Sequence, residues 1–214
     1  MRGLHAVETA ADYAILGSVL HNIDDYTGFR IGYNSASLHA SGFDATQGDN
    51  IPAFNLGIVF GWYLGNTDLA LEPGLYYSMK GGNLNELYDS NFSKKHGLST
   101  TEFTMHSFEV PLVLKMHLPI ASGVGIEPFA GAFMSFGFAG TTTLDNGDEY
   151  DTFDDRFLED FDAGFRFGAG LSINNLYFEA AYDLGLVNLC DSYEFDRHEA
   201  LRSRTWSFNI GINF

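Results

Sequence analysis

Histidine, serine and carboxylate side chains are the groups in this chain that could catalyse hydrolysis. The chain has seven histidines, and a hydrolase needs a base within hydrogen-bond reach of a nucleophile, with a third group that orients the base. His106 and Ser107 are neighbours, so in a strand they would point to opposite faces. A second set, in the last long polar stretch, comprises Ser192, His198, Glu199 and Ser203. Because stretches rich in Asp, Ser and His are common, we expect no enzymatic activity, and a hydrolase built on this set is the alternative.

Carboxylates are clustered around residue 150, where they could bind a cation. Carboxylate oxygens are ligands that Ca²⁺ prefers, but their spacing here does not match the EF-hand loop. A solvated acidic loop is therefore the expected structure, and weak cation binding or contact with a basic partner is the alternative. The candidate cation ligands are Asp145, Asp148, Glu149 and Asp151. We expect no bound cofactor.

The composition restricts the class of protein. The 214 residues carry 11 Lys and Arg against 28 Asp and Glu, a formal net charge of −17, which disfavours binding to nucleic acid. The 24 glycines and the aromatic content of 15% favour strands over helices. Cys190 is the only cysteine, so no internal disulfide can form. No apolar run of about 18 residues exists, so a closed barrel is the remaining way for this sequence to span a bilayer.

The strongest pattern in the sequence is a period-two alternation at its carboxyl end. Every second residue from Trp206 to Phe214 is apolar, and the residues between them are small or polar. Successive side chains of a strand point to opposite faces, so this segment predicts a strand with one apolar face. Seven earlier segments show the same alternation, which predicts eight strands in all. The eight segments include 29–34, 54–64, 69–80, 108–118, 124–138, 165–173, 176–186 and 204–214.

The polar faces of these segments indicate what the strands enclose. They carry few charges, nearly balanced in sign, and many glycines, whereas a water-soluble barrel such as a lipocalin would expose a face rich in lysine and poor in glycine. A narrow interior filled by ion pairs matches this composition. The predicted interior network consists of Arg30, Glu72, Glu109, Lys115, Glu127, Arg166, Glu179 and Asp183.

The turns make two parts of this network specific. If the sixth and seventh strands form a hairpin at their two-residue Asn-Asn turn, Arg166 lies directly opposite Asp183. Lys115 and Glu127 lie at similar distances from the turn that joins their strands, and Glu72 lies at a similar depth. We therefore expect Arg166 to pair with Asp183, and Lys115 to lie between two carboxylates.

The connections between the strands alternate between short and long. Short links lie at about 65–68, 119–123 and 174–175, and long polar ones at about 40–50, 82–103, 141–160 and 188–202. Outer-membrane barrels have short periplasmic turns and longer outer loops. The sequence therefore predicts an all-β fold: an eight-stranded antiparallel up-and-down transmembrane β-barrel over 27–214 in the outer membrane. Residues 1–26 are expected to form a leader, either a short helix or an irregular segment.

Several segments also resemble a known family. Segments 29–34, 71–82, 108–115 and 126–131 are similar to the small outer-membrane β-barrel family that includes PorT-like proteins. The resemblance extends over about 27–214 and implies an integral protein of a Gram-negative outer membrane. PorT itself is associated with secretion and gliding machinery. The leader and the acidic third long loop of this chain depart from the family's pattern, so the PorT role is not carried over.

The expected function follows from the predicted architecture. A barrel of eight strands leaves an interior that side chains fill, so we expect a closed lumen. Such a monomeric barrel, surrounded by outer-membrane lipid, would act as a structural or interaction protein through its long outer loops. Its partners would be other envelope proteins, in an accessory role in secretion or adhesion. A soluble lipocalin-like barrel for a small apolar ligand is the alternative outside the membrane.

Overall fold

A computed structural model describes most of the chain. The described residues are 25–41, 46–47, 51–85, 100–144, 147–153, 158–189 and 200–214. Nearly all of the predicted leader lies outside them, as do Asp145 and three members of the candidate hydrolytic set, namely Ser192, His198 and Glu199. In the described part of the chain, no helix is long and apolar enough to cross a membrane.

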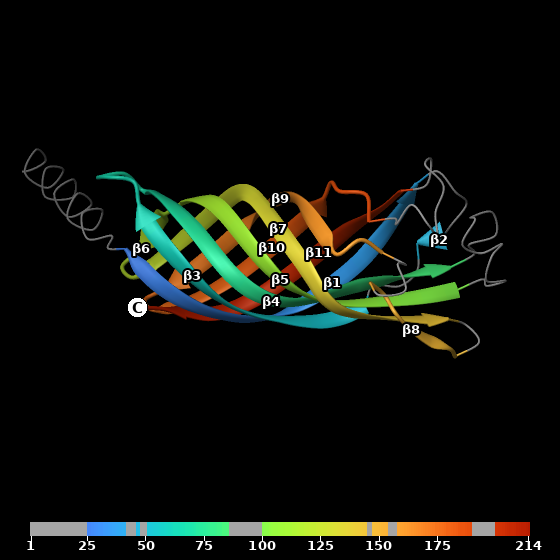
Figure 1. Ribbon diagram of the computed structural model, residues 1–214. Helices are drawn as coiled ribbons and strands as arrows, with labels where there is room; N and C mark the ends of the chain where they lie inside the picture. The colour runs from blue at the N-terminus through green and yellow to red at the C-terminus, as the bar shows by residue number, and fades with distance from the viewer. Residues whose placement is uncertain are drawn as a thin grey trace, which may run out of the picture.

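Eight long antiparallel strands form a closed barrel (Figure 1). Each long strand pairs with the next long strand along the chain, and the last one pairs with the first, which closes the ring. The strands are β1 (Tyr26–Ser41), β3 (Ile51–Tyr63), β4 (Leu69–Asn85), β5 (Thr100–Met116), β7 (Val124–Leu144), β9 (Phe161–Ile173), β10 (Leu176–Gly185) and β11 (Ala200–Asn213). Three short strands extend this sheet: β2 (Thr46–Gln47), β6 (Leu118–Ala121) and β8 (Glu149–Asp151). The predicted fold class, an eight-stranded up-and-down barrel, is therefore confirmed.

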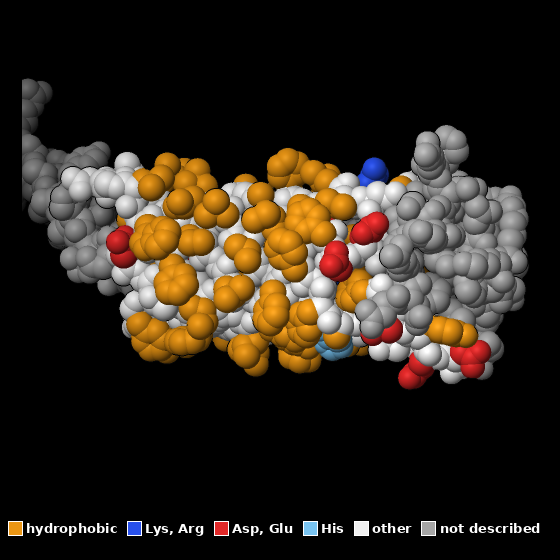
Figure 2. Space-filling model, viewed as in Figure 1, with side chains coloured by type: hydrophobic (Ala, Val, Ile, Leu, Met, Phe, Trp, Pro, Cys, Tyr) orange, Lys and Arg blue, Asp and Glu red, His pale blue; other side chains and the backbone are white. Residues whose placement is uncertain are grey.

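The two faces of the wall differ completely in chemistry. On β3 every second side chain from Ile51 to Trp62 is buried and its neighbours are exposed. Most of the exposed side chains on the long strands are apolar, as Ile31 at 60% and Phe208 at 51% illustrate. Figure 2 shows these apolar side chains spread over the barrel wall. A water-soluble barrel would turn such a face inward, whereas hydrocarbon covers it without cost.

The short turns, the start of β1 and the end of β11 all lie at the same end of the barrel (Figure 1). Gly65, Gly123 and Asn174 have positive φ angles of 65°, 70° and 51°, which the tight connections between strands require. Phe214 exchanges backbone hydrogen bonds of 2.9 and 3.2 Å with Thr27, so the closing strand is paired to its last residue. We call this end the short-turn end and the opposite one the long-loop end.

The strands continue further toward the long-loop end than the sequence predicts. β4, β5 and β7 have 17, 17 and 21 residues, whereas about 9–11 residues cross a bilayer. A register shift between His106 and Ser107 leaves Phe138 of β7 without an opposing residue. This bulge changes the alternation, so Thr142 points inward and is fully buried. The predicted loops at 82–103 and 141–160 are therefore partly strand, because runs of Gly and Thr show no apolar alternation.

We predict that a charge on the outer wall destabilises the protein in a bilayer. Ile210 lies midway along the apolar face of β11 and is 56% exposed. Ile210→Lys should lower the free energy of unfolding in phospholipid vesicles by about 2–4 kcal/mol, because a cation must enter hydrocarbon. Denaturant titration of the reconstituted protein measures this loss, with Ile210→Val as the control. Equal stability of the lysine variant would show that this face does not contact lipid.

Candidate functional site

Lys115 of β5 lies inside the barrel, close to two carboxylates. Its Nζ is 2.8 Å from Oε2 of Glu72 on β4 and 3.7 Å from Oε2 of Glu127 on β7. The Tyr26 hydroxyl donates to Glu72, and Nδ1 of His117 is 2.9 Å from Oε1 of Glu127. The Lys115 cluster, defined by these five residues, connects β1, β4, β5 and β7 near the short-turn end.

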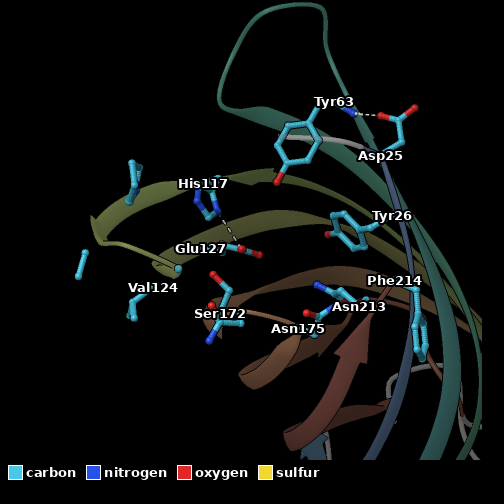
Figure 3. A pocket seen from close by; sticks show the side chains of 14 residues that line it. Asp25, Tyr26, Tyr63, His117, Val124, Glu127, Ser172, Asn175, Asn213 and Phe214 are labelled. Carbon is cyan, nitrogen blue, oxygen red and sulfur yellow. Dashed lines mark hydrogen bonds and ion pairs between the residues drawn. The ribbon is translucent and has the colours of Figure 1, made fainter. Parts of the chain in front are cut away.

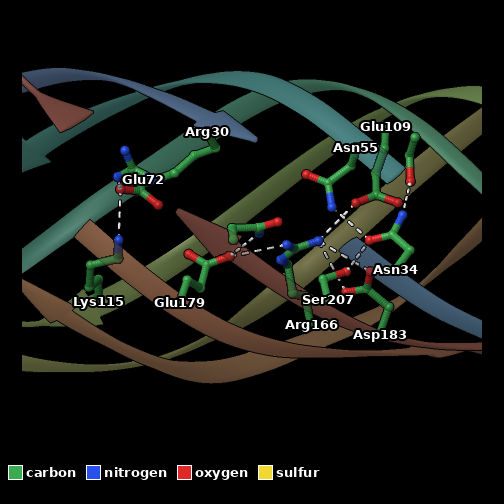
Figure 4. Close-up of polar contacts among 12 residues, drawn as sticks. Arg30, Asn34, Asn55, Glu72, Glu109, Lys115, Arg166, Glu179, Asp183 and Ser207 are labelled. Atoms are coloured by element: carbon green, nitrogen blue, oxygen red, sulfur yellow. Dashed lines mark hydrogen bonds and ion pairs between the residues drawn. The ribbon is translucent and has the colours of Figure 1, made fainter. Parts of the chain in front are cut away.

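Arg166 of β9 is the centre of a second interior cluster (Figure 4). Its Nη1 is 2.8 Å from Oε1 of Glu109 and 3.2 Å from Oδ2 of Asp183. Its Nη2 is 3.3 Å from Oε1 of Glu179. Lys80 forms an ion pair with the same Glu109. One guanidinium thus contacts carboxylates on β5 and β10, and the strand between β5 and β9 carries only a glycine, Gly131, opposite Arg166.

A set of amides and hydroxyls crosses the lumen beside the Arg166 cluster. The Asn34 side-chain oxygen accepts hydrogen bonds from Nδ2 of Asn55 at 2.6 Å and from Oγ of Ser207 at 2.8 Å. Nδ2 of Asn34 donates to Oγ of Ser78 at 3.1 Å. These four buried residues connect β1, β3, β4 and β11. The sequence places each of them on a polar strand face, which is the signal that could have identified them.

Tyrosine rings fill much of the remaining interior. The guanidinium of Arg30 is 4.2 Å from the centre of the Tyr177 ring, and Nζ of Lys115 is 4.3 Å from it. A Cβ added at Gly170 would be 2.0 Å from the Tyr177 hydroxyl, so the glycine makes room for this ring. Arg30 reaches a carboxylate only at 3.9 Å, at Glu72. Cation–π contacts therefore supplement the ion pairs.

All eight residues of the predicted network lie inside the barrel and are at most 7% exposed. Two further charged residues, Lys80 and Asp162, are also buried in the interior and were not part of the predicted set. Among the described residues the buried charges are four cations and six carboxylates. They are Arg30, Lys80, Lys115 and Arg166, and Glu72, Glu109, Glu127, Asp162, Glu179 and Asp183.

Several apolar side chains pack together in the interior at the long-loop end. Five leucine and phenylalanine side chains there are at most 2% exposed, and they are Leu38, Phe103, Leu158, Leu189 and Leu201. The backbone N–H of Glu159 donates to the Leu189 carbonyl at 2.9 Å, and that of Leu189 donates to the Leu201 carbonyl at 2.9 Å. The described parts of two long connections are thus attached to the mouth of the barrel. We call this set the apolar mouth.

A hollow of about 430 Å³ opens at the short-turn end (Figure 3). His117, Glu127 and Ser172 are among its lining residues. The Ser172 hydroxyl donates to the Gly125 carbonyl at 3.3 Å, whereas an activated serine would donate to the base. The hollow therefore leads to the Lys115 cluster without showing the hydrogen bonds of a hydrolytic triad among the described residues.

The remaining candidate chemical groups are separated in space. His106 contacts the Tyr77 hydroxyl at 2.6 Å, while Ser107 donates to the Ser78 carbonyl on the other face. Ser203 donates to the buried Asp162. Asp148, Glu149 and Asp151 are exposed in and beside β8. Within the described ranges, no group of three or more His, Cys, Asp or Glu residues is placed to hold a metal ion.

Comparison with known proteins identifies one family and several similar structures. The family model described as "Outer membrane protein beta-barrel domain" matches residues 26–191. Among solved structures, OprG from Pseudomonas aeruginosa is similar at 13% identity and a TM-score of 0.49, covering 91% of this chain and 97% of that one. The Ail attachment invasion locus protein of Yersinia pestis has 16% identity and a TM-score of 0.47, with coverage of 90% and 100%. Neisserial surface protein A has 15% identity and a TM-score of 0.46, with coverage of 89% and 97%. No curated protein sequence matches the chain.

We predict that the Arg166 cluster contributes strongly to stability. Arg166→Gln leaves three buried carboxylates with reduced compensation, and this should lower the free energy of unfolding by about 3–5 kcal/mol. Glu102→Gln, which also removes one charge but at an exposed position on the outer wall, should cost about 0.5 kcal/mol or less. Denaturant titration in vesicles measures both variants.

A double variant tests whether the pairing itself is responsible. Adding Asp183→Asn to Arg166→Gln removes one of the uncompensated carboxylates, so it should restore part of the lost stability. An Arg166→Gln protein as stable as the wild type would contradict the importance of the cluster.

Proposed function

Because the chain belongs to the outer membrane protein beta-barrel domain family, we propose that it is a closed barrel that anchors a contact platform on the cell surface. It is a protein of the outer membrane. The platform consists of the long-loop ends of the strands and the connections between them. Its role is that of a structural or interaction protein, in adhesion or as an accessory of a secretion assembly.

The buried interior carries the first half of this proposal. Arg30, Lys115 and Tyr177 lie on the inner face of the wall and are each at most 2% exposed. A water-filled lumen would expose them. Eight strands enclose only enough space for side chains, and here two charged clusters and several rings occupy it. The apolar mouth lies above them, and its buried leucine and phenylalanine side chains disfavour a continuous polar path through the described part of the barrel. This supports a protein that does not act as a pore.

The long strands support the second half of the proposal. β4, β5 and β7 are far longer than a bilayer requires, so their outer ends reach beyond the lipid. The β7–β8 hairpin presents Asp148, Glu149 and Tyr150 as exposed side chains. A partner with a basic surface fits this acidic hairpin by charge complementarity. Adhesion to such a surface is the form of contact that the hairpin favours.

We predict that the reconstituted protein does not conduct ions. Planar bilayers containing the wild-type barrel should show no stable single-channel steps, because charged side chains and rings fill the lumen. Tyr76→Ala combined with Tyr177→Ala removes two buried rings and should introduce a measurable leak. Stable channel openings by the wild type would rule out a closed barrel.

We predict that the acidic hairpin contributes to surface contact. Cells that display Asp148→Asn with Glu149→Gln should adhere less to a surface coated with polylysine than cells displaying the wild type, and the difference should disappear at high salt. Asp25→Asn, an exposed carboxylate at the short-turn end, is the matched control and should adhere like the wild type. Unchanged adhesion of the hairpin variant at equal surface expression would contradict this role.

A further inference from the structure

The few cations of this chain are distributed unevenly between the two faces of the wall. The described residues include six Lys and Arg side chains, of which four point into the lumen. The other two, Arg202 and Arg204, alternate with the buried Ser203 and Thr205 on β11 and therefore point outward. In the face that Figure 2 shows, blue side chains occur only at the edge of the apolar wall toward the long-loop end. The outer wall thus has one described cationic position, and it is at that edge.

The register places a third nitrogen-bearing side chain beside this pair. His39 of β1 lies opposite Arg202, and Ser37 lies opposite Arg204. Directly opposed residues of an antiparallel pair point to the same face, so His39 is also on the outer wall. Arg202 and Arg204 are two residues apart on one strand, which separates their Cα atoms by about 7 Å. We call Arg202, Arg204 and His39 the outer cation pair with its histidine.

The two guanidinium groups have no counter-ion in the described part of the chain. The described ion pairs of the protein all lie inside the barrel. Nε of Arg204 is buried and has no hydrogen-bond partner there. Glu102 and Glu149 lie on β5 and β8, away from β11 in the sheet order. Glu159 is linked through Leu189 to Leu201 of β11, but no described ion pair joins it to either arginine. Two adjacent guanidinium groups therefore have donors available for an anion from outside.

The position of Arg202 and Arg204 along the wall matches the level expected for the lipid headgroups. Trp206, the next outward residue toward the short-turn end, is 47% exposed, and its ring lies 4.9 Å from that of Tyr182. Trp and Tyr side chains are enriched at the membrane–water interface. Arg204 lies about 7 Å further along the strand, with apolar Leu184 beside it on β10. Arginine side chains just beyond an aromatic belt reach the level of lipid phosphates.

We propose that Arg202 and Arg204, with His39 beside them, bind the phosphate group of a lipid in the outer leaflet. Guanidinium groups bind phosphate through paired hydrogen bonds, and two of them on one strand face can hold one phosphate from both sides. The long-loop end is the outer one in barrels of this architecture, so the lipid belongs to the outer leaflet. The net charge of −17 otherwise repels anionic headgroups. We therefore expect an anionic headgroup to bind at this position on the wall and not elsewhere on it.

Fluorescence of Trp206 can report the binding. The chain has two tryptophans, so Trp62→Phe leaves Trp206, two residues from Arg204, as the single reporter. The detergent-solubilised barrel is titrated with bisphosphorylated lipid A and with the same lipid after removal of its phosphates. We expect the emission of Trp206 to respond to the phosphorylated lipid at a concentration at least about tenfold lower than to the dephosphorylated lipid.

Substitutions separate a phosphate site from general contact with lipid. Arg202→Gln with Arg204→Gln should weaken binding of the phosphorylated lipid by about tenfold or more, whereas Arg202→Lys with Arg204→Lys should retain part of the affinity. Glu102→Gln, which also changes one outward charged side chain at this end, should bind like the wild type. Heat-modifiable migration on gels verifies that each variant is folded, and Arg202→Gln alone serves if the double variant does not fold.

Three results would overturn the proposal. The dephosphorylated lipid could bind as tightly as the phosphorylated one, which would show apolar contact only. The folded double glutamine variant could bind the phosphorylated lipid with wild-type affinity. Inorganic phosphate alone could bind with the affinity of the lipid and displace it, which would show a site for free anions instead of a lipid site.

Discussion

The absence of hydrogen-bonding partners in hydrocarbon is the constraint on which this structure depends. Every backbone N–H and C=O group at membrane depth must be paired within the protein. The pairing of β1 with β11, which extends to the last residue, Phe214, removes the two free edges that an open sheet would leave. Once the ring is closed, the two faces of each strand have only one arrangement: apolar side chains contact lipid, and polar side chains must satisfy one another inside.

The interior meets this requirement through a few shared partners. Arg166 contacts three carboxylates and Lys115 contacts two, so each cation compensates more than one buried charge. Removing ions from water costs several kcal/mol each, and only such multiple contacts offset that cost. Glycines on the inner face leave space for the tyrosine rings, as Gly170 does for Tyr177. The same packing that stabilises the barrel supports the proposal of a closed lumen.

The two ends of the barrel differ because they face different surroundings. The short-turn end uses tight connections at Gly65, Gly123 and Asn174, and a hollow there leads to the Lys115 cluster. The long-loop end has strands that continue beyond the lipid, an apolar mouth, an acidic hairpin and the outer cation pair. Charged groups outside the lumen are therefore concentrated at the long-loop end, while the wall between the ends serves one requirement, contact with hydrocarbon.

The sequence by itself determined the properties that depend on neighbours along the chain. Period-two alternation identified the strands and their lipid-facing sides, and the turn at 174–175 implied the register that places Asp183 opposite Arg166. Only the tertiary structure decided which residues meet across the lumen. Glu109 contacts Arg166 over an intervening strand, four polar residues of four strands meet at Asn34, and a bulge at Phe138 shifts the face of the residues beyond it. Alternation specifies the face of a side chain, whereas contacts across a closed barrel depend on the stagger of all eight strands together.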